Sequence, residues 1–199
     1  MRPSIDRLGE LLRATPPKQV ERGPATRVAA VAAVLRERAE PEILLIKRAV
    51  HPRDPWSGHM AFPGGRQDPA DVDSVATAIR ETREEVGIDL AAHGRLLGTL
   101  DDIQAVWRAQ RVDIVIVPHV FRLDAEVTPA PDPSEVDAAL WTPLGPMLRD
   151  ETRTSFAYRH EGQDLELPAW RVGEEVVWGL TQRMLEGLFG LLRREGVGT

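Results

Sequence analysis

The sequence contains no cysteine, which excludes disulfide bonds, thiolate metal ligands and a cysteine nucleophile. This composition fits a reducing compartment. The chain also lacks any apolar run long enough to span a bilayer, and residues 1–19 have no uninterrupted apolar stretch of the kind that secretory signals need. We therefore expect a cytoplasmic protein that does not have a membrane as its partner.

A block of basic residues is also missing. The formal net charge is −6, whereas a general nucleic-acid-binding protein would need a basic surface. A small phosphate compound remains compatible with this charge, because metal ions can bridge carboxylates to phosphates. We expect a small-molecule diphosphate as the partner and no nucleic acid, and we leave a homodimer open.

The length of 199 residues suits one domain with a sizeable core. We expect an N-terminal extension over residues 1–22, followed by a single domain over residues 23–199. There is no internal repeat, and the expected helices and strands alternate irregularly. This arrangement predicts an α+β fold or a mixed sheet between helices.

Hydrophobic periodicity and turn residues place the individual elements. Residues 51–71 are rich in proline, glycine and aspartate, so we expect mostly loop there. The pattern of residues 27–35 favours a buried strand, although its alanines are also compatible with a helix. We expect helices at 5–14, 74–86 and 175–194, strands at 27–35, 42–47, 96–102, 112–121 and 139–142, and a hairpin formed by 156–160 and 164–169.

The helix at 74–86 places three carboxylates on one face. At about 100° per residue, Glu84 and Glu85 lie roughly 60° and 40° to either side of Glu81. Asp73 or Ser74 is a suitable N-cap, and Gly87 suits the left-handed residue that ends a helix. An apolar stripe lies almost opposite the carboxylates and is made of Val75, Ile79, Thr82 and Val86.

Two interpretations of this acidic face are open. It could be solvated, although like charges three and four residues apart repel one another. It could instead bind a hard cation such as Mg²⁺ or Mn²⁺, which prefers oxygen ligands. The preceding Phe62-Pro-Gly-Gly65 favours the cation, because paired glycines let the backbone approach an ion or a ligand closely.

Together these features resemble the Nudix hydrolases. The signature of that family ends in Arg-Glu-apolar-x-Glu-Glu-x-Gly-apolar, and residues 80–88 follow it except at Thr82. The first half departs from the family pattern. Counting from Gly65, Asp71 occupies the position of the usual glutamate, and eight residues instead of seven separate it from Arg80.

This longer form of the signature, or box, is similar to that of the coenzyme A pyrophosphatase branch. In that branch Gly-Gly-x-x-Asp-x-x-Asp precedes Thr-Ala-x-Arg-Glu-Thr. Residues 64–71 and 77–82 follow both parts, and residues 45–48, 97–102 and 177–181 also resemble that branch. One departure concerns the substrate. Trp56 stands where the branch has histidine, and His59 comes three residues later. The departure bears on coenzyme A specificity and not on diphosphate cleavage.

The resemblance implies a Nudix-like α/β/α sandwich with a mixed, curved β-sheet. It also implies a metal-dependent pyrophosphohydrolase that cleaves coenzyme A or acyl-coenzyme A to 3′,5′-ADP and 4′-phosphopantetheine or its acyl form. The alternatives are another nucleoside diphosphate derivative such as ADP-ribose, or a non-catalytic nucleotide-binding regulator.

The resemblance further implies that Glu81, Glu84 and Glu85 bind Mg²⁺, with Mn²⁺ as a substitute and the Gly64 carbonyl as an additional ligand. Arg80, with Asp71, would orient the glutamates. Residues 62–65 are called the glycine loop. Basic groups near it are candidates for substrate binding, namely Arg48, His59 and Arg66. Three acids remain candidates for the general base, namely Asp101, Asp102 and Glu135.

Overall fold

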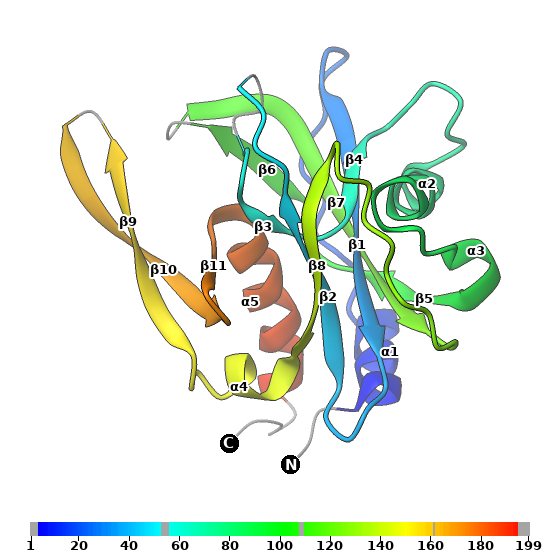
Figure 1. Ribbon diagram of the computed structural model, residues 1–199. Helices are drawn as coiled ribbons and strands as arrows, with labels where there is room; N and C mark the ends of the chain where they lie inside the picture. Colours follow the sequence, from blue (N-terminus) through cyan, green and yellow to red (C-terminus); the bar gives the residue numbers. More distant parts are fainter. Residues whose placement is uncertain (1–3, 53–55, 108–109, 161, 195–199) are drawn as a thin grey trace.

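The computed structural model describes residues 4–52, 56–107, 110–160 and 162–194. A mixed sheet lies between helices (Figure 1). Its central order is β3-β2-β1-β7-β5, while β4, β6 and β8 pair with β1, β7 and β2. These strands are β1 (Arg27–Arg36), β2 (Glu42–Arg48), β3 (Met60–Ala61), β4 (Gly64–Arg66), β5 (Gly94–Thr99), β6 (Ile103–Trp107), β7 (Gln110–Leu123) and β8 (Val136–Pro143).

The remaining strands form a separate small sheet in the order β11-β10-β9. They are β9 (Arg153–His160), β10 (Gln163–Val172) and β11 (Glu175–Trp178). Five helices are assigned in the described residues: α1 (Ile5–Ala14), α2 (Ser74–Val86), α3 (Leu90–His93), α4 (Leu144–Leu148) and α5 (Gly179–Arg194). The expected sandwich with a mixed sheet is confirmed, since β1 pairs in parallel with β7 and antiparallel with β2.

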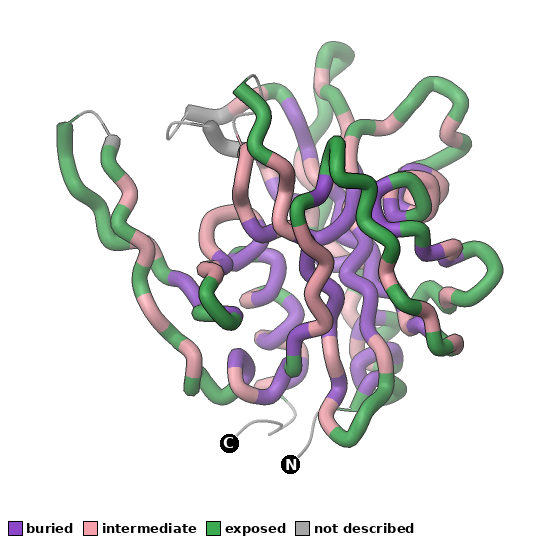
Figure 2. The backbone as a smooth tube through the Cα atoms, in the orientation of Figure 1, coloured by how far each residue is buried: buried purple, intermediate pink, exposed green. Residues whose placement is uncertain are grey.

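Two apolar cores lie on opposite faces of the large sheet (Figure 2). Side chains alternate between the faces of a strand, so Ala30 and Ala32 join the core under α2 while Ala33 and Leu35 join the core under α1, α4 and α5. The alanines of β1 are therefore strand residues. Their small side chains leave room for α2 to pack directly on β1.

Helices α1 and α2 have the predicted bounds, and both predicted caps of α2 are present. The Asp73 side chain accepts a hydrogen bond from the Ala76 N–H at 2.8 Å. Gly87 ends the helix with a φ of 68°, in the left-handed region that favours glycine. A buried histidine also fixes the start of α2, because the His119 ring bonds Ser74 Oγ at 2.9 Å and Thr99 Oγ1 at 3.0 Å.

The described part of residues 51–71 is mostly loop, as predicted, and also contains the short strands β3 and β4, of which β4 is held by pairing with β1. Other predicted elements were wrong in type or in bounds. The helix expected from Glu175 begins only at Gly179, because Glu175–Trp178 pairs with β10 and Gly179 has a φ of 67°. Strand β6 and the short helix α3 were not predicted. Strand β4 pairs with a strand distant in the chain, whereas β6 and β11 form hairpins with the neighbouring β7 and β10, and α3 is capped by Asp89.

The N-terminal extension packs into the domain. Ile5, Leu8 and Leu12 of α1 are buried in the same core as residues of α5. The following segment is held by two acids, since Asp101 accepts from the Lys18 N–H at 2.8 Å and Asp102 from Arg22 at 2.9 Å. Among the described residues, no helix is both long and apolar enough to cross a membrane.

This packing predicts that α1 stabilises the whole fold. Leu8 is only 1% exposed, so Leu8→Ala should lower the free energy of unfolding by about 2–5 kcal/mol. Chemical denaturation would measure the loss. The half-buried Leu11 on the same helix is the matched control, and Leu11→Ala should cost less. Equal stability of Leu8→Ala and the unaltered chain would show that α1 is dispensable.

Candidate active site

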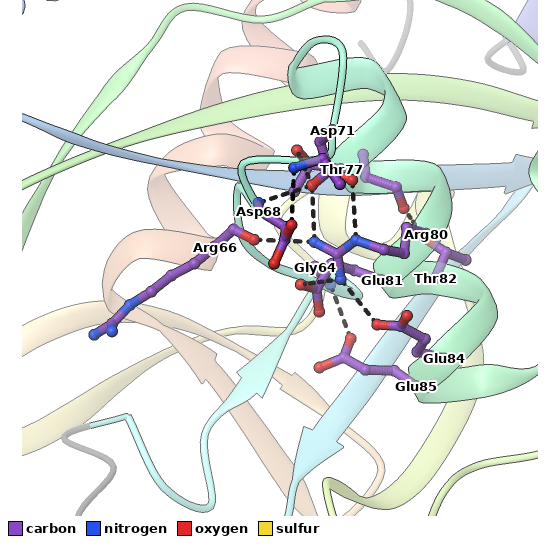
Figure 3. Close-up of polar contacts among 12 residues, drawn as sticks. Gly64, Arg66, Asp68, Asp71, Thr77, Arg80, Glu81, Thr82, Glu84 and Glu85 are labelled. Atoms are coloured by element: carbon purple, nitrogen blue, oxygen red, sulfur yellow. Dashed lines mark hydrogen bonds and ion pairs between the residues drawn. The ribbon is translucent and has the colours of Figure 1, made fainter.

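Arg80 organises the polar cluster at the centre of α2 (Figure 3). Its Nε and Nη2 donate to the two carboxylate oxygens of Asp71, at 3.0 and 2.9 Å. Its Nη1 donates to both Glu81 and Glu84 at 2.8 Å, and Nη2 also reaches the Arg66 carbonyl at 3.0 Å. One guanidinium thus ties the loop before α2 to two of the three carboxylates on the helix.

Asp71 is a nearly buried anchor for this guanidinium. Besides its two bonds from Arg80, it accepts from Thr77 Oγ1 and from the Asp68 N–H, each at 2.9 Å. The bonds from Arg80 hold the pKa of Asp71 well below its usual range, and Asp71 in turn raises the pKa of Arg80. Both groups therefore stay charged. Asp71 has a shorter side chain than the glutamate of the family signature, and one more residue separates it from Arg80. Its carboxylate still contacts the Arg80 guanidinium.

Glu85 points into the protein and is 2% exposed. Its carboxylate accepts from the Gly64 N–H at 2.8 Å and lies 3.8 Å from an Arg48 nitrogen. Burial raises the pKa of Glu85 to about 8, and the charges of Glu81 and Glu135 raise it further, while the bond from Gly64 and the charge of Arg48 oppose the shift. The positive charge near the Glu85 carboxylate therefore does not offset the cost of its burial when no metal ion is bound.

Glu81 lies against the backbone of the glycine pair. A side chain at Gly65 would bring its Cβ to 2.5 Å from a Glu81 carboxylate oxygen, so any larger residue there would displace this carboxylate. Burial raises the pKa of Glu81, and its bond from Arg80 opposes the shift. Contrary to the helical-wheel prediction, the buried face of α2 includes Glu85 as well as Val86, so the acidic face borders the core at Glu85.

A cavity of about 480 Å³ opens between this helix, the glycine loop and the start of α5. Most of the predicted site residues line it, together with Trp56: Arg48, His59, Gly64, Arg66, Glu81, Glu85 and Glu135. Arg66 contributes its side chain separately from its carbonyl, since the side chain points away from the Arg80 cluster (Figure 3). The structure therefore brings together acidic groups, basic groups and a close backbone approach in one cavity.

Other predicted residues are absent from the cavity wall. Arg80 lies behind the carboxylates, and the Glu84 side chain is 52% exposed and bonded to Arg80. Asp101 and Asp102 hold the N-terminal segment through the bonds described above. Among the three candidates for the general base, only Glu135 lines the cavity.

Several residues of the cavity wall were not predicted as site residues. Ile114 and Ile116 come from β7, and Trp178, Leu180, Thr181 and Met184 come from β11 and α5. Trp178 stacks on Phe156 with ring centroids 4.1 Å apart, and its centroid lies 4.6 Å from that of His59. The similarity of residues 177–181 to the coenzyme A pyrophosphatase branch was the signal that could have placed Trp178 at the site.

The chemistry of this helix turn fits a hard divalent cation, which prefers carboxylate oxygens. The buried and incompletely neutralised Glu85 supports this fit. In the described part of the chain, however, no three acidic, histidine or cysteine side chains already form a metal-binding group. The expected set of three glutamates is not assembled, because Arg80 holds Glu81 and Glu84.

Known proteins resemble this chain in sequence and in fold. A family model described as the NUDIX domain matches residues 25–159. An uncharacterized protein of Schizosaccharomyces pombe is 41% identical over 117 residues, covering 57% of this chain and 35% of that protein. The mitochondrial coenzyme A diphosphatase of Homo sapiens is 32% identical over 157 residues, covering 78% of this chain and 64% of that protein. The chain thus spans less than two thirds of the length of each of these relatives.

A solved structure supports the fold alone. The crystal structure of a MutT/nudix family protein from Enterococcus faecalis superposes with a TM-score of 0.60 at 15% identity. The superposition covers 96% of this chain and 70% of that chain.

The burial of Glu85 predicts how the stability of the metal-free protein varies with pH. Its pKa rises from 4.5 to about 8 on folding, so the fold favours the protonated group. That contribution is complete below about pH 4.5 and is lost as the pH rises through about 8. Glutamine carries no charge and still accepts the bond from Gly64. Glu85→Gln should therefore melt at a higher temperature than the unaltered chain at pH 9, with a smaller difference at pH 5.

Thermal melts in the presence of a chelator would measure this difference. We expect a gain of a few degrees at pH 9, since 1 kcal/mol corresponds to roughly 2–4 °C in a chain of this size. Glu84→Gln is the control, because that side chain is exposed and should show no comparable growth with pH. A pH-independent difference for Glu85→Gln would mean that the carboxylate is not buried as described.

Proposed function

Because the chain belongs to the NUDIX domain family, we propose that it is a hydrolase that cleaves the diphosphate linkage of a nucleoside diphosphate derivative. The observation that carries this proposal is the cavity in which Glu81 and Glu85 meet the glycine loop beside Arg48. Acidic groups for a cation and basic groups for phosphate thus share one wall. This pairing suits a diphosphate, which needs its negative charge neutralised.

A bound Mg²⁺, or Mn²⁺ as its substitute, would be held by Glu81 and Glu85, with Glu84 and the Gly64 carbonyl as further candidate ligands, and would polarise the diphosphate and lower the pKa of water. Glu84 would have to leave its bond to Arg80 in order to take part. Arg80 and Asp71 would keep the helix turn in place, as outer residues commonly do in metal sites.

The side chains of the cavity supply the remaining functions. Arg48 and Arg66 would bind phosphate oxygens and reduce their negative charge. Glu135 would accept a proton from the attacking water. Attack of that water on one phosphorus breaks the phosphoanhydride P–O bond and gives two phosphorylated products. Because water attacks directly, this reaction needs no covalent intermediate between the substrate and the protein.

Coenzyme A or an acyl-coenzyme A is the proposed substrate. The similarity to the human coenzyme A diphosphatase and the box over residues 64–82 support it. Trp56 lines the cavity where the branch has histidine, which keeps other nucleoside diphosphates such as ADP-ribose in consideration. A nucleotide-binding regulator without turnover is the second candidate, and the exposed, Arg80-bound Glu84 is the observation that favours it.

The proposed metal site predicts the effect of removing the Glu85 charge on turnover. Activity should require Mg²⁺ or Mn²⁺ and disappear with chelator. Glu85→Gln should reduce kcat by about a hundredfold or more, since even outer residues of metal sites are worth about 10–100-fold. Steady-state assays would measure kcat, with Arg83→Gln on the exposed side of α2 as the control. Near-full activity of Glu85→Gln would show that the metal site lies elsewhere.

The basic residues of the cavity predict the substrate preference. At equal concentration with Mg²⁺, coenzyme A should be cleaved faster than dephospho-coenzyme A, which lacks the 3′-phosphate. The loss should be roughly ten- to a hundredfold in kcat/KM, because a charge-assisted bond is worth about 1.5–3 kcal/mol. Arg48→Gln or Arg66→Gln should abolish that difference if the residue contacts this phosphate.

ADP-ribose is the decisive competitor in the same assay. Faster cleavage of ADP-ribose would exclude coenzyme A as the preferred substrate and leave diphosphate hydrolysis standing. Binding of all three compounds without cleavage of any would favour the regulator.

A further inference from the structure

The β9–β10 hairpin has one apolar face and one polar face. Directly paired residues lie on the same face of a sheet, and the register pairs Phe156 with Leu167 and Tyr158 with Leu165. We call these four residues the hairpin strip. The opposite face of the same part of the hairpin is exposed and mostly polar, with Ser155, Ala157, Arg159, Asp164 and Glu166.

The hairpin strip continues directly from the wall of the diphosphate cavity. Trp178 lines the cavity, and it pairs with Ala169, which places it on the same face as Leu167. Its ring stacks on Phe156 at 4.1 Å and lies 5.6 Å from the Tyr158 ring. From the level of Ala169 to that of Leu165 the strand advances about 13 Å, at roughly 3.3 Å per residue.

The outer end of the hairpin strip is open to solvent. Leu165 is 38% exposed, whereas Phe156, Tyr158 and Leu167 are half-buried. The outer part of strands β9 and β10 stands away from the large sheet (Figure 1) and is largely exposed (Figure 2). Contiguous apolar side chains on an otherwise polar arm are typical of a binding surface.

The charges around the cavity indicate which part of a ligand meets the strip. Glu81, Glu85 and Arg48 gather at the glycine loop, so the diphosphate belongs at that end. Among the described residues of the strip and Trp178 there is no charged side chain. A ligand whose charged diphosphate continues into an uncharged arm that ends in an apolar chain, as in an acyl-coenzyme A, would match both regions.

We infer that the hairpin strip binds the apolar tail of the substrate, and that Leu165 and Tyr158 set the preference for long acyl chains. This inference rests on the proposed function and adds to it the residues that select the tail. Each methylene that moves from water onto the strip would strengthen binding by up to about fourfold. The preference for an acyl chain should therefore increase with its length until the chain passes Leu165.

The acyl-length dependence of binding tests the inference. Binding of coenzyme A and of its butanoyl and octanoyl forms would be measured by calorimetry on the full chain, with chelator to prevent turnover. The unaltered chain should bind octanoyl-coenzyme A at least tenfold more tightly than coenzyme A. Leu165→Ser and Tyr158→Ser should each reduce that ratio to threefold or less. Ala157→Ser, on the exposed opposite face, is the matched control and should keep it.

Three results would overturn the inference: equal affinity of the unaltered chain for all three compounds, an unchanged ratio in both strip variants, or a dimer that Leu165→Ser dissociates. The last result would identify a second copy of the chain as the occupant. Hydrolysis of coenzyme A with Mg²⁺, measured on the same samples, keeps the two ideas separate. Absence of that activity in every sample would contradict the proposed function, whereas the acyl ratio tests the strip alone.

Discussion

The site depends on keeping like charges close together on one turn of a helix. Glu81, Glu84 and Glu85 would repel one another, and each is stabilised differently. Arg80 neutralises Glu81 and Glu84, while Glu85 is buried and bonded to the backbone of Gly64. Asp71 completes the arrangement by fixing Arg80 from the preceding loop. The contacts that offset this repulsion also direct the carboxylates of Glu81 and Glu85 into the cavity.

Small residues make this crowding geometrically feasible. Alanines on the inner face of β1 let α2 lie close to the sheet, and Gly65 lets the backbone pass beside the Glu81 carboxylate. The parallel pairing of β1 with β7 and the pairing of β4 with β1 then hold the glycine loop in place. The residues with no functional group therefore determine the distances between the residues that have one.

Local patterns in the sequence predicted the parts of the structure that depend on neighbours along the chain. The bounds of α1 and α2, the Asp73 cap and the Gly87 terminus are of this kind. The pairing of β4 with β1, which depends on a distant partner, was missed. The hairpin of β10 and β11 was also missed, since residues 175–178 were included in the predicted C-terminal helix. The residues of the candidate site fall into two groups, those predicted from the sequence and those that were not. The helix supplied its candidates directly, whereas the role of Trp178 required the fold, because β11 joins the cavity only through its tertiary position.

The two cores also differ in how far apart in the chain their members lie. The core under α2 is built from residues between Ala30 and Val136, whereas the opposite core needs both α1 and α5. Contacts between distant segments carry a larger loop-closure entropy and tend to form slowly. During synthesis, the face that carries α2 can gather before α5 exists. The other face can close only after α5 has been made, so its apolar surface remains uncovered until then.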